Sequence, residues 1–187
     1  MNESILQAVK VLREGGIILY PTDTIWGIGC DATNEDAVRK VYDIKKRSDS
    51  KALVMLASSL DMVARYIKEI PQMAIELVEV NDAPMTIIYP GAIGLAPNAI
   101  AEDSSVGIRI PLKGSCIDLV KRFGKPLVST SANISGEPAP QNFEEIPQSI
   151  KDSVDFIVSP EACDLEKGKP SQIIKVELDG VVKIIRA

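Results

Sequence analysis

The chain has 187 residues, of which 45% are hydrophobic, and its formal net charge is −5 at pH 7. These values fit one globular domain and give no sign of a basic nucleic-acid-binding arm. The chain contains no histidine, which excludes Ser-His-Asp triads, Cys-His pairs and histidine metal ligation. Its three cysteines lack C-x-x-C spacing, so we expect neither a disulfide framework nor a thiolate zinc site, but reduced cysteines in a cytoplasmic protein.

Helices and strands are predicted to intermix along the whole chain. The first half predicts a helix over residues 5–12, a strand over 17–20, a helix after Asn34 that ends near Lys45, a strand over 52–57 and short helices over 59–67 and 71–80. The second half predicts strands over 84–90 and 104–111, a helix over 115–123, a helix over 143–150, a strand over 154–159 and a hairpin of strands 172–178 and 181–185. Because βα alternation is not strict, we expect one α/β domain over residues 1–187, with a twisted mixed β-sheet flanked by helices.

The N-terminal pattern is that of an amphipathic helix rather than a signal peptide. No apolar run is long enough to cross a bilayer, so we expect no membrane association.

The most informative stretch is residues 127–138, LVSTSANISGEP, which passes from apolar residues to closely spaced hydroxyl and amide groups. Such a composition is typical of a solvated turn. It also suits a strand end where Ser129, Ser131 and Asn133 converge on an oxyanion. Both interpretations stay open from this stretch alone.

Two further stretches are polar where the predicted strands or helices end. Residues 21–24, Pro-Thr-Asp-Thr, either close a strand as a Ser/Thr turn or form a hydroxyl-rich pocket wall, and the ligand-facing residue could be Thr22 or Thr24. Residues 45–51, KKRSDSK, carry cations that either complement a helix dipole, worth about 0.3–1 kcal/mol each, or clamp a polyphosphate. Arg109 shares a strand face with Ser105 and Gly107, so it either lies on the surface or points into a cleft.

In combination, these stretches closely resemble the YrdC-type family. Residues 20–29, YPTDTIWGIG, resemble its threonine-rich signature, Lys45-Lys46-Arg47 with Lys51 its K-x-R element, and residues 129–136 its S-x-N element. Residues 84–86, 105–109 and 170–173 are supporting matches. The resemblance extends from about Ile17 to Ile174 and therefore covers nearly the whole chain.

The resemblance implies a defined activity. Members of this family make threonylcarbamoyl-AMP and pyrophosphate from L-threonine, bicarbonate or CO₂, and ATP, for the N6-threonylcarbamoyladenosine modification at tRNA position 37. It implies a YrdC-like fold with a large concave cavity and no additional C-terminal domain. It also implies ATP as substrate with Mg²⁺, no tightly bound protein-ligated metal, a downstream threonylcarbamoyl transferase complex as partner, and weak contact with tRNA.

The resemblance also implies roles for individual residues. Lys45 and Arg47 would be catalytic and would bind ATP together with Lys51, Ser105, Ser131 and Asn133, whereas Thr24, Arg109 and Ser129 would bind threonine. The arginine fork suits a substrate carboxylate.

Three other interpretations of the sequence stay open. The first is a YrdC-like paralogue with a different acceptor, and the second is a scaffolding protein in a tRNA-modifying complex. The third is an RNA-binding module that uses the same concave face, which the negative net charge disfavours because phosphate affinity needs clustered cations.

Overall fold

The computed structural model describes residues 3–46, 53–160 and 170–187, and its strands form two sheets. The smaller sheet, in the order β7-β2-β1-β8, contains β1 (Ile18–Pro21), β2 (Trp26–Gly29), β7 (Thr130–Ser131) and β8 (Phe156–Ile157). The larger sheet, in the order β10-β9-β4-β5-β3-β6, contains β3 (Val54–Leu56), β4 (Met85–Tyr89), β5 (Val106–Arg109), β6 (Leu127–Val128), β9 (Gln172–Val176) and β10 (Val182–Arg186). Both contain parallel and antiparallel pairs. The predicted mixed α/β fold is confirmed, with its strands divided between two sheets rather than gathered in one.

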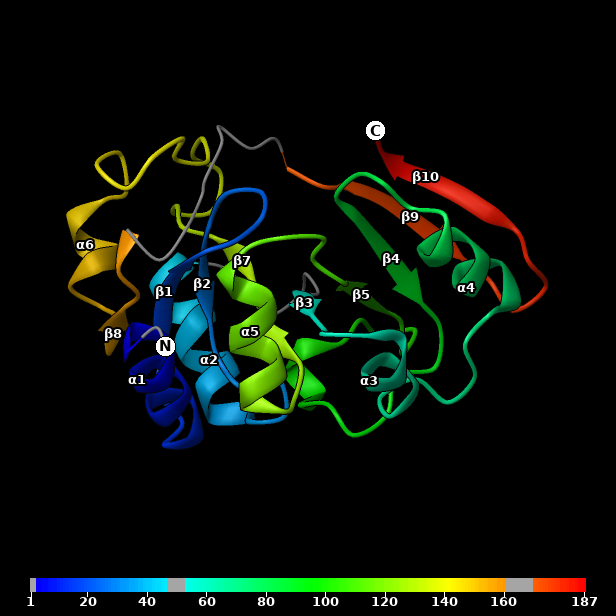
Figure 1. The fold of residues 1–187 in the computed structure, drawn as a ribbon, viewed down its shortest axis with the longest axis horizontal. Helices are drawn as coiled ribbons and strands as arrows, with labels where there is room; N and C mark the ends of the chain where they lie inside the picture. Colours follow the sequence, from blue (N-terminus) through cyan, green and yellow to red (C-terminus); the bar gives the residue numbers. More distant parts are fainter. Residues whose placement is uncertain (1–2, 47–52, 161–169) are drawn as a thin grey trace.

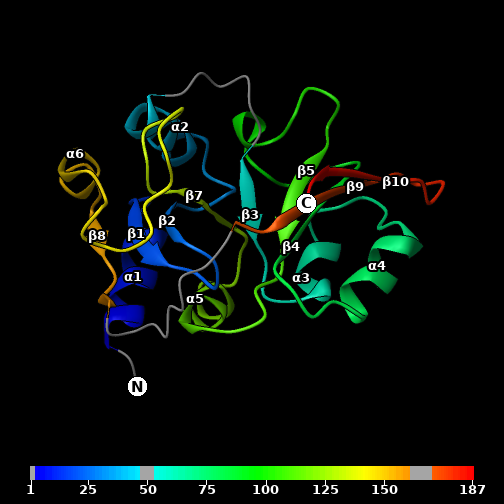
Figure 2. The ribbon, with the colours of Figure 1, turned by 90° about the horizontal axis from the view of Figure 1, so that it is seen from above.

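The helices lie beside both sheets. They are α1 (Glu3–Arg13), α2 (Glu35–Lys45), α3 (Leu60–Ala64), α4 (Gln72–Glu79), α5 (Ser115–Phe123) and α6 (Gln148–Lys151), with a 3₁₀ turn, η1 (Pro97–Ala99). Figures 1 and 2 show α1 beside the smaller sheet, and α3 and α4 at the end of the molecule formed by β4, β9 and β10. No helix in the described ranges is long and apolar enough to cross a membrane.

Two predicted helix ends are confirmed, the start of α2 at Asn34 and the end of α5 at Gly124. The Asn34 side chain accepts a hydrogen bond from the N–H of Ala37 at 3.1 Å and begins α2, as an N-cap should. Gly124 ends α5 in the left-handed conformation, with φ of 82°. The helix predicted over residues 143–150 is wrong in extent, because only Gln148–Lys151 is helical. Pro147 precedes it and favours extended backbone before it, so the pattern breaks at that proline.

Residues 127–131 belong to both sheets. β6 pairs with β3 in the larger sheet, and β7 pairs with β2 in the smaller one. Ser129, between the two strands, donates its N–H to the carbonyl of Val54 at 2.8 Å. The chain therefore crosses from one sheet to the other at the stretch that the sequence singles out.

The core is formed by apolar side chains from both sheets and the helices beside them. The apolar stripe predicted for α1 is buried. Cys30 and Cys116 are buried, and burial raises the pKa of Cys30. Cys163 lies outside the described residues.

Gly29 lies against the ring of Tyr20, and we predict that this position accepts no larger residue without loss of stability. A Cβ at Gly29 would lie 2.6 Å from Cε1 of Tyr20 and 2.9 Å from the backbone oxygen of Val128. Gly29→Ala should therefore lower the free energy of unfolding by about 1–3 kcal/mol, measured by chemical denaturation. Gly107→Ala is the matched control, because its Cβ would meet only side chains, at 3.3 Å or more. Equal losses for the two variants would contradict this account.

Candidate functional site

A pocket of about 430 Å³ takes its wall from both sheets. This volume lies within the range of about 300–1,000 Å³ that is usual for small-molecule sites. The smaller sheet and its loops contribute Thr22, Thr24, Ile25, Trp26, Gly27, Thr130, Ser131 and Asn133, and the larger sheet contributes Val54, Arg109, Ile173 and Arg186. Ser129, at the crossing between the sheets, also lines the pocket.

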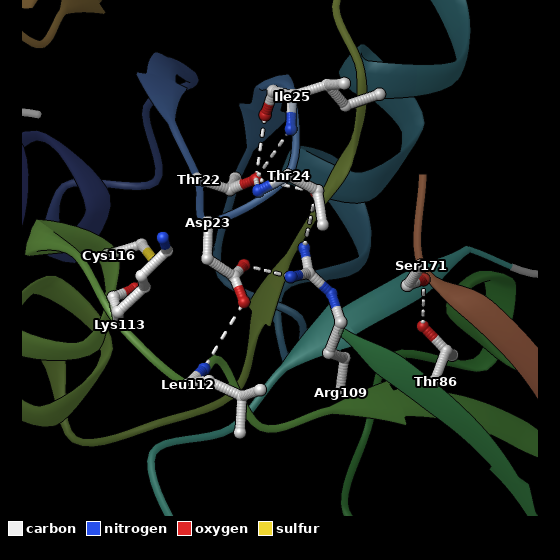
Figure 3. Close-up of polar contacts among 10 residues, drawn as sticks. All are labelled: Thr22, Asp23, Thr24, Ile25, Thr86, Arg109, Leu112, Lys113, Cys116 and Ser171. Carbon is white, nitrogen blue, oxygen red and sulfur yellow. Dashed lines mark hydrogen bonds and ion pairs between the residues drawn. The ribbon is translucent and has the colours of Figure 1, made fainter. Parts of the chain in front are cut away.

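The threonine-rich turn is organised by the hydroxyl of Thr22. Its Oγ1 donates to the carbonyl of Ile25 at 2.7 Å and accepts the N–H groups of Thr24 and Ile25 at 3.1 and 3.3 Å (Figure 3). The Oγ1 atoms of Thr22 and Thr24 lie 3.0 Å apart, within hydrogen-bond distance of each other. The turn interpretation and the pocket-wall interpretation are therefore both correct.

Arg109 reaches this turn from the end of β5 and forms a buried ion pair with Asp23. The exposed fractions of the two side chains are 5% and 1%. The Nη1 group of Arg109 donates to Oδ1 of Asp23, and its Nη2 group donates to Oγ1 of Thr24 at 3.3 Å. The N–H of Leu112 donates to the other carboxylate oxygen, at 3.3 Å (Figure 3). Arg109 therefore points into a pocket rather than to the surface, with its guanidinium held by the turn.

The second polar wall is the stretch that begins at Ser129. Oγ of Ser131 donates to Oδ1 of Asn133 at 2.5 Å, and Nδ2 of Asn133 donates to the carbonyl of Glu137 at 2.5 Å. Behind this wall, Lys45 is 3% exposed, and its Nζ donates to the carbonyl oxygens of Ser131 and Asn133 at 2.6 and 2.8 Å. The first part of the stretch is therefore a bonded polar wall, whereas residues 135–138 are exposed and form a turn, so each interpretation holds for one part.

A third group of hydrogen-bonded polar side chains lies on the larger sheet. Oγ1 of Thr86 and Oγ of Ser171 form a buried hydrogen bond of 2.8 Å (Figure 3). Arg186, on the edge strand β10, donates from Nε and Nη2 to the carbonyl of Ser171 at 3.1 and 2.6 Å. The sequence patterns assign no ligand role to Asp23, Ser171 or Arg186. Asp23 and Ser171 lie in the motif-like stretches quoted above, but nothing around Arg186 signals a pocket residue.

The structure brings together five of the residues that the resemblance implicates. Thr24, Arg109, Ser129, Ser131 and Asn133 all line the pocket. Lys45 lies behind the wall, and Ser105 precedes β5, roughly 13 Å of extended chain from Arg109, with its N–H bonded to the Asp103 carboxylate at 3.0 Å. Arg47 and Lys51 lie outside the described residues.

Carboxylates are sparse around the pocket. Glu137 lines it, whereas Asp23 is bound by Arg109. Over the described ranges, no three or more histidine, cysteine, aspartate or glutamate side chains gather in a way that could hold a metal ion.

Comparison with known proteins assigns the chain to a family. Residues 10–187 match the model of the Sua5/YciO/YrdC family, which carries the description "Telomere recombination". The chain therefore belongs to the Sua5/YciO/YrdC family, and the resemblance seen in the sequence is confirmed.

Particular relatives cover most of the chain. It is 33% identical over 170 residues to the threonylcarbamoyl-AMP synthase of Vibrio parahaemolyticus, a match that covers 89% of this chain and 91% of the relative. The structure of E. coli YciO matches with a TM-score of 0.85 and 25% identity, over 100% of this chain and 89% of that one. P. abyssi Sua5 complexed with L-threonine matches with a TM-score of 0.83 and 26% identity, over 95% of this chain. This chain spans only 52% of that Sua5 chain.

The buried Asp23–Arg109 ion pair should contribute to the free energy of unfolding. Asp23→Ala should lower the free energy of unfolding by about 3–5 kcal/mol, because it leaves a buried guanidinium without its counter-charge. Arg109→Met should lower the free energy of unfolding by a similar amount, because it leaves the buried Asp23 carboxylate without its counter-charge. In a double-mutant cycle by chemical denaturation, the double variant should lose much less than the sum of the single losses. Additive losses would mean that the two side chains do not depend on each other.

Proposed function

We propose that this protein is an L-threonylcarbamoyladenylate synthase, a nucleotidyltransferase that supplies the N6-threonylcarbamoyladenosine modification of tRNA. One observation supports this most directly. A single pocket joins a buried arginine suited to a carboxylate with a separate wall of hydroxyl and amide groups suited to a nucleotide. The name of the Vibrio relative, which aligns over 89% of this chain, points to the same reaction.

In this proposal, threonine binds against the turn of the smaller sheet. Two of the five N–H donors of Arg109 bind Asp23 and Thr24, and the remaining donors receive the substrate carboxylate. Ser129, on the adjacent wall, contacts the threonine. The nucleotide lies beyond it, along Ser131 and Asn133.

The chemistry requires alignment and charge neutralisation rather than a covalent nucleophile. The threonine amine adds to CO₂ and loses a proton, giving a carbamate. A carbamate oxygen then attacks the α-phosphorus of ATP, the bond to the bridging oxygen of the β-phosphate breaks, and pyrophosphate leaves. Holding both substrates in one pocket makes this attack effectively intramolecular, so the lack of histidine is no obstacle.

Cations would balance the negative charge of the phosphates. Arg47 and Lys51 are assigned to this role by the family resemblance, and Arg186 is a cation on the pocket wall itself. Mg²⁺ would arrive with ATP, since it commonly uses substrate phosphates with only one or two protein carboxylates, and Glu137 is a carboxylate residue on the pocket wall. Nucleotide contact by Ser105 stays a prediction. A separate transferase would pass the threonylcarbamoyl group to tRNA.

The deciding experiment measures pyrophosphate release from ATP with each of the twenty amino acids, with and without bicarbonate. We expect release that requires both L-threonine and bicarbonate. Arg47→Ala should reduce it by roughly 100-fold or more, because one contact to developing charge is worth about 2.7–4 kcal/mol. Arg39→Ala is the control, because Arg39 is an exposed arginine paired with Glu35 and Asp36 on α2. Release that does not depend on threonine would indicate a paralogue with another acceptor.

Trp26 provides a second test, of the two halves of the pocket. It is the chain's single tryptophan, it lines the pocket, and its ring centroid lies 5.0 Å from that of Phe143. Its fluorescence should therefore report titration with L-threonine or ATP. Ser129→Ala should weaken threonine binding, and Ser131→Ala ATP binding, each by about 3–10-fold, as for one neutral hydrogen bond. Exchanged effects of the two variants would overturn the assignment of the two walls.

A further inference from the structure

We propose that Lys45 is a positioning residue whose ammonium group holds the Ser129–Glu137 wall in its binding conformation, and is not a ligand of the nucleotide phosphates. This assignment rests on the proposed function for its effect on substrates. It departs from the role that the K-x-R resemblance implies, in which Lys45 contacts ATP directly.

The proposal rests on the hydrogen bonds of the Lys45 ammonium group. Its Nζ lies 2.6 Å from the carbonyl oxygen of Ser131, 2.8 Å from that of Asn133 and 3.2 Å from Oδ1 of Asn133. A lysine ammonium has three N–H donors and no acceptor, so these three oxygens match its full donor capacity. A phosphate oxygen could bind only by displacing one of them.

The burial of Lys45 also indicates that its ammonium group binds the protein and not a phosphate. Lys45 is 3% exposed and lies outside the pocket wall, although its neighbour Lys46 is exposed. A buried charge is tolerated when its donors are satisfied, and removing those partners is costly. Lys45 is also the last residue of α2, where the helix dipole favours a cation. The protein therefore stabilises this charge in place without a ligand.

The backbone of Lys45 ties the same wall from a second side. Its carbonyl oxygen accepts the N–H of Ser135 at 3.0 Å. The side chain and the backbone of one residue thus bind both ends of residues 131–135. Oδ1 of Asn133 accepts from Lys45 and from Ser131 together, so the ammonium also fixes the orientation of that amide.

A consequence separates this role from direct phosphate binding. Residues 129–137 line both the proposed threonine half and the proposed nucleotide half of the pocket. If Lys45 holds this wall, its loss must weaken both substrates. If it binds phosphate, its loss must weaken ATP alone.

The first experiment uses the wild-type protein and needs no activity. Site-resolved acetylation by mass spectrometry would compare Lys45 with Lys46, the adjacent exposed control. We expect Lys45 to react at least about tenfold more slowly than Lys46 in the absence of ATP, because it reacts only after local opening. Equal rates without ATP, or protection of Lys45 that appears only when ATP is added, would overturn the proposal.

The second experiment measures binding through Trp26 fluorescence in Lys45→Met, with Lys46→Met as the control. Lys45→Met should weaken L-threonine binding in the absence of nucleotide by roughly tenfold, and ATP binding by at least as much. Unchanged threonine affinity with weakened ATP binding would overturn the proposal. If the variant does not fold, the acetylation result still decides, and it does so even if the protein releases no pyrophosphate. Failure of this inference and failure of the proposed function are therefore distinguishable.

Discussion

The arrangement of the pocket depends on one constraint, which is that residues 127–131 pair with two different sheets. β6 is fixed to β3 by the ladder of the larger sheet, and β7 is fixed to β2 by that of the smaller sheet. Ser129, between them, is held by its N–H bond to Val54. The backbone at this crossing cannot move without disturbing strand pairing on at least one side. The residues that carry hydroxyl groups there are therefore fixed in position by both sheets, and well-positioned donors are what recognition of an anion requires.

Two buried cations extend this rigidity into the adjoining segments. Lys45 and Arg109 are 3% and 4% exposed, and each binds protein oxygens. Transfer of such charges out of water is expensive, so they are stable only where hydrogen bonds satisfy them. Arg109 is fixed by Asp23 and Thr24, and Lys45 by the backbone carbonyls of Ser131 and Asn133. The cations thus hold two turns as defined walls of the pocket.

The sequence predicted much of the fold and of the pocket wall. The reasons differ between local features, such as helix ends, and features that depend on distant strands. Short-range signals worked where one residue decides the backbone, as Asn34 and Gly124 do at helix ends. The motif stretches identified five wall residues, because hydroxyl, amide and guanidinium groups were concentrated there. The division into two sheets was not predictable, since it depends on which distant strand each half of residues 127–131 pairs with. Arg186 was missed for the same reason: it reaches the pocket only because β10 pairs with β9 and so brings its guanidinium to Ser171.

For Lys45, the role that the family resemblance implies differs from the role that its contacts indicate. A motif records that a lysine stands at a position, but not whether its charge faces the ligand or the protein. The sequence pattern of a helix C-terminus followed by more cations fits both cases equally. Three oxygen acceptors within 3.2 Å favour the protein-facing case. Under the proposed function, Lys45 contributes to phosphate recognition through the wall it supports, while Arg47, Lys51 and Arg186 meet the phosphates. A site without histidine can then hold a carboxylate and a polyphosphate side by side, because one set of cations fixes the geometry and another neutralises the charge.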